Sequence, residues 1–144
     1  MAKLLKNRGL QYALSAEFTL NVTDTMVMTD GIEKLFSVAA PVADIIGLPP
    51  NAVVVGGDVT VETVSNDTGT ATIAVGDSGS ASRYLGATSI KTAARTALVP
   101  TGYRSTGEDI RITLANQNGN ATAGTVTVRV QYVVTGRTNE VQVA

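Results

Sequence analysis

The chain has 144 residues and a formal net charge of -1, with 11 Lys and Arg against 12 Asp and Glu. This length is typical of one domain and is enough to bury a core without disulfide or metal support. His, Cys and Trp are all absent from the sequence, so the residues that most enzymes use for proton transfer, thiol chemistry and soft-metal binding are missing. The balanced charge provides no basic stripe for a nucleic acid. No catalytic residue, cofactor, metal ion or small-molecule substrate is therefore expected.

Residues 1–15 show no clear period and are interpreted as an extended N-terminal arm, followed by a single domain over residues 16–144. Lys3, Lys6 and Arg8 make this arm basic. The segment that follows is too short for a secretory signal, which needs about 7–15 apolar residues, and no stretch reaches the ~18 apolar residues of a membrane helix. A frayed terminus is the alternative to a functional arm.

The first half of the chain predicts strands separated by turns. Phe18, Leu20 and Val22 alternate with polar residues, as in a half-buried strand. Further strands are expected over 26–28, 32–38 and 52–64, and the Gly56-Gly57 pair in the last of these permits a bulge. Between them, Pro41 is expected to open one helical turn that Gly47 closes.

The second half continues the same pattern. Strands are expected at 70–75, 84–85, 89–90, 97–99, 110–114 and 126–132. Asn118-Gly119 is a hairpin turn signal. Thr occurs twenty times and Val nineteen times, and such β-branched residues fit pleated sheets. We therefore expect an all-β, jelly-roll-like β-sandwich of about eight strands, although an immunoglobulin-like topology shares these periodicities.

Gly76-Asp77-Ser78-Gly79 resembles the G-D-S-G sequence around the nucleophile of chymotrypsin-like serine proteases. That chemistry needs a histidine base, and the chain has none. A Ser78 nucleophile served by Lys34 or Lys91 is the remaining enzyme hypothesis, and nothing in the sequence places either lysine near Ser78. Because Gly, Asp and Ser are ordinary turn residues, the motif is interpreted as a loop.

Arginine dominates the cations of the second half of the chain. Arg is favoured over Lys at protein interfaces because its planar fork pairs with carboxylates and stacks on rings. Protein contact and simple surface solvation are both open explanations for these residues. They are Arg83, Arg95, Arg104, Arg111, Arg129 and Arg137.

Three segments together resemble a known family. They are the run L-P-P-N-A-V-V-V-G-G-D-V from Leu48 to Val59, the loop V-G-D-S-G-S-A-S-R-Y-L from Val75 to Leu85, and the ending G-T-V-T-V-R-V-Q-Y-V-V-T-G-R from Gly124 to Arg137. In overall pattern, over roughly residues 17–140, the chain is similar to the capsid cement or decoration proteins of tailed bacteriophages. The resemblance implies a jelly-roll body, a homotrimer on the outside of the capsid, and a role in clamping neighbouring major capsid proteins. It implies no catalytic residues.

Two sets of residues are candidates for contact with other protein chains. The basic residues of the arm, Lys3, Lys6 and Arg8, are candidates for contact with the major capsid protein. The trimer interface is expected on the last strand, with Val126, Val128, Arg129 and Tyr132 as candidates.

The expected location is the capsid exterior of a virion, with synthesis in the cytoplasm of the bacterial host. A tail-fibre, head-fibre or receptor-binding module is the alternative function. The shortage of aromatic residues for stacking on sugars, four Tyr, two Phe and no Trp, weakens that alternative.

Overall fold

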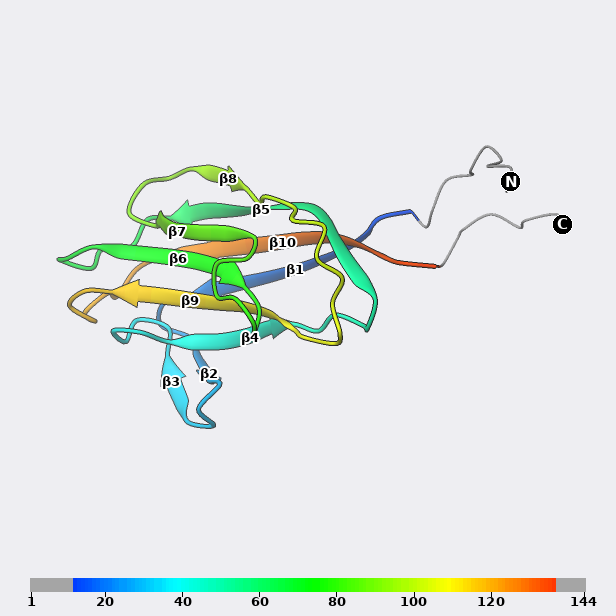
Figure 1. Ribbon diagram of the computed structural model, residues 1–144. Helices are drawn as coiled ribbons and strands as arrows, with labels where there is room; N and C mark the ends of the chain where they lie inside the picture. The colour runs from blue at the N-terminus through cyan, green and yellow to red at the C-terminus, as the bar shows by residue number, and fades with distance from the viewer. Residues whose placement is uncertain (1–11, 137–144) are drawn as a thin grey trace, which may run out of the picture.

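The computed structural model describes residues 12–136, and within them the chain forms ten β-strands and no helix (Figure 1). The strands are β1 (Leu14–Asn21), β2 (Thr25–Val27), β3 (Glu33–Leu35), β4 (Val42–Ile46), β5 (Ala52–Thr63), β6 (Ala71–Gly76), β7 (Leu85–Ser89), β8 (Arg95–Ala97), β9 (Ile110–Asn116) and β10 (Thr125–Val134). The all-β prediction is confirmed.

Eight of these strands form two four-stranded antiparallel sheets that face each other. The first sheet has the order β1-β10-β5-β8 and the second β4-β9-β6-β7. The β2–β3 hairpin lies outside both sheets (Figure 1). Without the hairpin, the strand orders in chain sequence are 1-8-3-6 and 2-7-4-5, which is the double Greek key of a jelly roll. The topology thus selects the predicted jelly roll over the immunoglobulin-like alternative.

The core fills the space between the two sheets with alternate residues of each strand. On β10, Val126, Val128 and Val130 are fully buried, and on β9 Ile110 and Ile112 are fully buried. These are the inward positions that the period of two predicts, because successive side chains of a strand point to opposite faces. Burial of these aliphatic surfaces contributes about 25 cal/mol per Å² and is the main stabilising term of the fold.

A bulge interrupts the pairing of β5 with β10. The register passes from Gln131 opposite Gly56 to Tyr132 opposite Val54, which leaves Val55 without an opposite residue. Gly57 adopts a φ of 134°, and a Cβ at this position would lie 2.2 Å from the Arg129 carbonyl oxygen. The extra residue is Val55, directly before the glycine pair at which the sequence permits a bulge, while Gly56 and Gly57 keep regular pairing. Gly57 is required at its own position because a Cβ would collide with the Arg129 carbonyl.

Two local predictions were wrong. The helical turn expected from Pro41 to Gly47 is instead strand β4, which pairs with β9 and buries Ala43 and Ile46. Tertiary pairing therefore overrides the local helix signals. Asn118-Gly119 does form a turn, with Gly119 at a φ of 62°, but it joins β9 and β10, which belong to different sheets. It is a connection between sheets and not a hairpin.

The chain enters β1 and leaves β10 at the same end of the sandwich (Figure 1), because these two strands are antiparallel neighbours. Leu14 pairs with Tyr132, so the first strand begins inside the segment predicted to be an arm. Residues 1–11 lie outside the described part of the chain.

Candidate interaction surface

The outer face of the first sheet carries a row of alternating charges that crosses all four strands. Glu17 on β1 lies opposite Arg129 on β10, and Arg129 lies opposite Asp58 on β5. Arg129 Nε donates to Glu17 Oε2 at 2.9 Å and Arg129 Nη1 to Asp58 Oδ1 at 3.3 Å. Arg95 on β8 completes the row by donating from Nε to Asp58 Oδ2 at 2.7 Å. We call these four residues the charge ladder.

Asp58 is the central acid of the charge ladder and is 8% exposed. Burial alone would raise the pKa of this carboxyl, but the hydrogen bonds and positive charges of Arg95 and Arg129 outweigh that effect and lower the pKa. The hydrogen bonds and negative charges of Glu17, and after it of Asp58, raise the pKa of Arg129. Asp58 and Arg129 are therefore oppositely charged at neutral pH, and the hydrogen bonds of the ladder position both arginines on the sheet.

Hydroxyl groups continue this polar face next to the ladder. Thr19 Oγ1 and Thr127 Oγ1 lie 3.0 Å apart across β1 and β10, and Thr127 Oγ1 donates to Glu62 Oε1 at 2.8 Å. A shallow hollow of about 140 Å³ opens beside the ladder. Its lining consists of Ser15, Ala16, Glu17, Asp58, Arg129 and Gln131. Such a face suits hydrogen bonding to polar groups of another protein.

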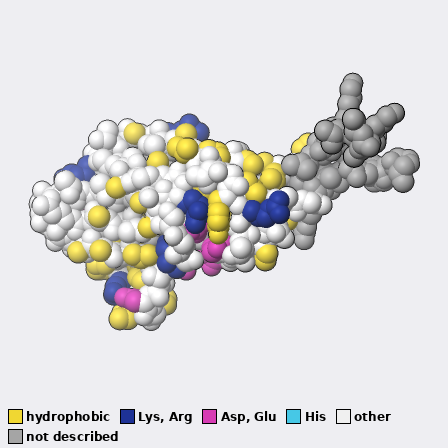
Figure 2. All heavy atoms as spheres, viewed as in Figure 1, with side chains coloured by type: hydrophobic (Ala, Val, Ile, Leu, Met, Phe, Trp, Pro, Cys, Tyr) yellow, Lys and Arg dark blue, Asp and Glu magenta, His cyan; other side chains and the backbone are white. Residues whose placement is uncertain are grey.

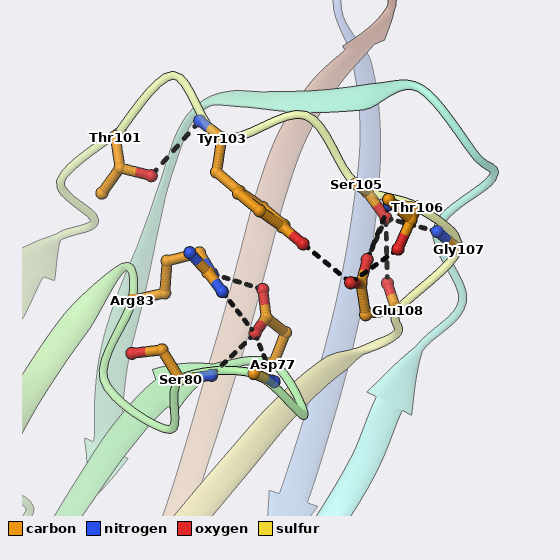
Figure 3. A network of polar contacts seen from close by, with 10 residues as sticks. Asp77, Ser80, Arg83, Thr101, Tyr103, Ser105, Thr106, Gly107 and Glu108 are labelled. Atoms are coloured by element: carbon orange, nitrogen blue, oxygen red, sulfur yellow. Dashed lines mark hydrogen bonds and ion pairs between the residues drawn. The ribbon is translucent and has the colours of Figure 1, made fainter.

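A second polar cluster joins the 76–83 loop to the 101–109 loop near the end of the sandwich (Figure 3). Arg83 donates to both carboxylate oxygens of Asp77, from Nε at 2.6 Å and from Nη2 at 3.2 Å. The Arg83 guanidinium also lies over the Tyr103 ring, with 3.6 Å between the guanidinium carbon and the ring centroid. The hydrogen bonding of Arg83 to the Asp77 carboxylate is the main cause of the raised pKa of Arg83.

Tyr103 extends the cluster to Glu108. The tyrosine hydroxyl donates to Glu108 Oε1 at 2.7 Å, and Thr106 and Ser105 supply further donors to the same carboxylate. These hydrogen bonds, led by that from Tyr103, lower the pKa of Glu108 to about 2. Donation to a carboxylate also raises the pKa of Tyr103. The cluster fastens two long loops to each other.

The G-D-S-G residues belong to this cluster in a structural role. Asp77 Oδ1 accepts the backbone N–H groups of Gly79 and Ser80, each at 2.9 Å, and so closes the loop. Ser78 is exposed. Neither lysine of the enzyme hypothesis contacts it, because Lys34 pairs with Asp30 and Lys91 donates to the carbonyls of Asp67 and Gly69.

The β2–β3 hairpin presents exposed apolar side chains (Figure 2). Val27, Ile32 and Leu35 are all exposed on it. Met28 at its turn end and Phe36 at its open end are buried in the core. Figure 2 shows the hairpin projecting from the body with apolar side chains next to basic and acidic ones. An apolar projection of this kind is a second candidate for contact with a partner.

The predicted interface residues separate into three groups. Lys3, Lys6 and Arg8 lie outside the described residues. Arg129 and Tyr132 are half-buried, the former in the charge ladder and the latter packed against the core.

Val126 and Val128 are fully buried between the two sheets. Their side chains are used inside the domain and are not available to a second copy, so their assignment to a trimer interface is corrected. The inward face of a sandwich strand is occupied by the opposite sheet of the same chain.

Most of the arginines of the second half have acidic partners within the chain. Arg83, Arg95 and Arg129 pair as described, and Arg111 pairs with Asp44 at 2.7 Å. Sequence reasoning identified these arginines but missed the acids that hold them. The alternation of β1 could have indicated that Glu17 points outward. That Arg129 lies opposite Glu17 follows only from the strand register.

No group of three or more acidic residues within residues 12–136 is arranged to hold a metal ion. No helix in that part of the chain is long and apolar enough to cross a membrane.

Residues 12–136 form a jelly-roll sandwich whose first sheet carries charges on its outer face. No protein-family model and no curated protein sequence matches the chain. Solved structures do match it, and they come from phage capsids.

A chain of the cyanophage Pam1 capsid asymmetric unit aligns with a TM-score of 0.62 and 24% identity, covering 92% of this chain and 94% of that one. A chain of the acidic-stable capsid of Helicobacter pylori bacteriophage KHP30 aligns at 0.60 and 16% identity, covering 87% and 90%. A chain of the capsid of Ralstonia phage GP4 aligns at 0.55 and 16% identity, covering 92% and 90%. The fold is thus shared with chains of phage capsids, as the sequence resemblance implied.

Proposed function

We propose that this chain is a non-enzymatic structural protein of a phage virion, and specifically a cement or decoration protein on the outside of the capsid. The observation that carries the proposal is the whole-length structural match to three phage capsid chains. In each case at least 90% of the capsid chain is covered, so those chains are also of single-sandwich size. The sequence resemblance to capsid cement proteins points to the same class independently.

The chemistry of the described surface supports binding to protein. The charge ladder and the exposed Thr19 hydroxyl present polar groups on the outer face of the first sheet, and the β2–β3 hairpin adds apolar side chains. Interfaces combine such apolar anchors with a polar surround. The proposed partner is the major capsid protein, with synthesis in the host cytoplasm before attachment.

A homotrimer is the proposed assembly. Three linked copies engage a capsid with high effective concentration, which adds ~10²–10⁴ in avidity without any new type of contact. The half-buried Arg129 and Tyr132 remain the candidates for the trimer contact, and the arm residues Lys3, Lys6 and Arg8 remain the candidates for the capsid contact. Light scattering of the purified protein measures the oligomeric state, and a mass near that of one chain would contradict the trimer.

Co-sedimentation tests the function directly. Purified protein is mixed with capsids that lack it, in the unexpanded and expanded forms, and the capsids are pelleted. We expect saturable binding to at least one form, and failure to bind either would refute the proposal. Deletion of residues 1–11, which leaves β1 intact, is expected to weaken binding while the melting temperature stays within about 4 °C of that of the full chain.

A further inference from the structure

The four edges of the two sheets are not equally protected against pairing with another chain. Proteins usually shorten, bulge or cover edge strands because these expose unpaired backbone groups. Strand β8 has only three residues, and β4 and β7 pair with their neighbours in irregular register. In contrast, β1 keeps a regular register with β10 over all eight residues, from Leu14 opposite Tyr132 to Asn21 opposite Thr125.

The hydrogen-bond phase of β1 identifies the backbone groups on its free side. Just past the strand, the Val22 N–H donates to the Gly124 carbonyl at 2.9 Å. Because hydrogen-bonded and non-hydrogen-bonded pairs alternate in an antiparallel ladder, the even-numbered residues of β1 bond to β10. The N–H and C=O groups of Ser15, Glu17 and Thr19 therefore point away from the sheet. Asn21 fits this alternation, since its N–H also points away from β10 and donates to Asp24 Oδ2 at 3.0 Å.

Nothing in the sequence of β1 blocks this edge. The strand, L-S-A-E-F-T-L-N, contains neither Pro nor Lys, which are the residues commonly placed to prevent pairing. Among residues 12–136, none bonds to the backbone of Ser15, Glu17 or Thr19. Within the described residues, Asp24 closes the Asn21 end of the edge, since its N–H donates to the Asn21 carbonyl and its carboxylate accepts the Asn21 N–H. Six adjacent backbone groups are thus arranged to receive a strand.

The side chains of β1 determine what that strand should contain. On the inner side, Ala16 and Phe18 are half-buried and pack against the core, with Phe18 edge-on to Phe36 at 6.4 Å between ring centroids. On the outer side, Glu17 is the only charge of the strand. Since cross-strand neighbours pair apolar with apolar and acid with base, the complementary segment alternates apolar residues with Thr, Lys or Arg.

A second copy of β1 does not meet this requirement. For Ser15, Glu17 and Thr19 all to pair in an antiparallel arrangement, Glu17 of one copy would lie opposite Glu17 of the other. Like charges directly opposite each other are destabilising. The charge therefore favours a segment of a different sequence.

We propose that the free edge of β1 receives an extended segment of the capsid shell protein as a fifth strand of the first sheet, an inference that rests on the function proposed above. Recognition is by backbone hydrogen bonds to Ser15, Glu17 and Thr19, with selectivity from Phe18 on one face and Glu17 on the other. This is β-strand addition, in which the ladder provides affinity and alternate side chains provide specificity.

Proline substitution at outward-pointing positions tests the proposal without breaking the fold. Ser15→Pro or Thr19→Pro removes an N–H that β10 does not use, and proline is tolerated on the free side of edge strands. We expect both variants to bind capsids about tenfold or more weakly, with a melting temperature within about 4 °C of wild type. Ser15→Ala keeps the N–H group and removes only the hydroxyl, so it should weaken binding much less than Ser15→Pro does. Ala16→Pro removes a ladder bond to β10 and should instead destabilise the sandwich.

The outcomes separate this proposal from the proposed function. If wild-type protein binds capsids and both outward proline variants bind equally well, the edge proposal is overturned and the capsid role stands. If wild type fails to bind, the capsid role fails. If the proline variants change the oligomer mass, the edge belongs to the subunit interface and the proposal is wrong.

Cross-linking gives an independent readout of the occupant. The chain has no native cysteine, so Thr19→Cys introduces a single thiol beside the edge. Treatment of decorated capsids with a short thiol-to-amine cross-linker should yield a product with the shell protein. A product containing only two copies of this chain would contradict the proposal.

Discussion

Arg83 lies over the ring of Tyr103, with 3.6 Å between the guanidinium carbon and the ring centroid, while both carboxylate oxygens of Asp77 accept its N–H groups. The guanidinium thus has a ring on one side and an acid at its edge, and it connects two loops that are distant in sequence. This arrangement depends on the planar fork of arginine, which lysine does not possess.

The first prediction concerns this contact. Arg83→Lys is expected to lower the free energy of unfolding by about 1–3 kcal/mol, because it loses the stacking and the second hydrogen bond and leaves the buried Asp77 under-paired. Chemical denaturation measures the change. Arg104→Lys is the matched control, since Arg104 is exposed on the 101–109 loop beside Tyr103, and it should lie within about 0.5 kcal/mol of wild type. Equal effects of the two substitutions would contradict the structural role of the cluster.

The lowered pKa of Glu108 predicts that its contribution to the stability of the fold depends on pH. Its pKa is lowered from the ordinary 4.5 to about 2 in the fold, chiefly by the Tyr103 hydroxyl and by Thr106. A depressed carboxyl pKa stabilises the fold above the unfolded pKa, and this stabilisation is lost as the pH falls toward the folded pKa.

Glu108→Gln should therefore melt at a lower temperature than wild type above pH 4.5, and the difference should shrink as the pH approaches 2. Thermal melts across this range provide the measurement. A difference that stays constant with pH would mean that the charge of Glu108 is not what stabilises the 101–109 loop.

The alternation of side chains could be predicted from the sequence because it is a local property. Ile110, Ile112 and Leu114 on β9 were expected on one face and are all buried. The pairing of strands was not predictable in the same way. The β4 segment lacks a clear period of two, and only its pairing with β9 makes it a strand.

The candidate site was harder to predict for a related physical reason. Val128 and Arg129 are adjacent in the sequence, and alternation places them on opposite faces of β10. Which face meets the other sheet and which meets solvent depends on the topology. The partners of Arg129, Glu17 and Asp58, are 112 and 71 residues away in sequence, so no local pattern could reveal the charge ladder.

Gly76 and Gly86 differ in the space around them, which predicts different effects of alanine on stability. A Cβ on Gly76 would lie 2.0 Å from the Ser80 carbonyl oxygen, whereas a Cβ on Gly86 would meet no heavy atom within 4 Å. Gly76→Ala should therefore cost about 2–4 kcal/mol, because the loop backbone must move.

Gly86→Ala is the matched control for Gly76→Ala. We expect it to be neutral or to stabilise the fold by about 0.5 kcal/mol, since alanine restricts the unfolded chain. Denaturant titration compares the two variants. Similar losses at both positions would show that the close approach at Gly76 is not the cause.

The last prediction tests the assignment of Val128 to the core. Val128→Ala removes two buried methyl groups from between the sheets and should cost about 1–3 kcal/mol of unfolding free energy. Val99→Ala is the control, because that side chain is 63% exposed, and it should change stability by less than about 0.5 kcal/mol. Light scattering well below the melting temperature should give the same mass for both variants and for wild type. A change of mass in Val128→Ala while the sheet signal in circular dichroism is intact would return this residue to the subunit interface.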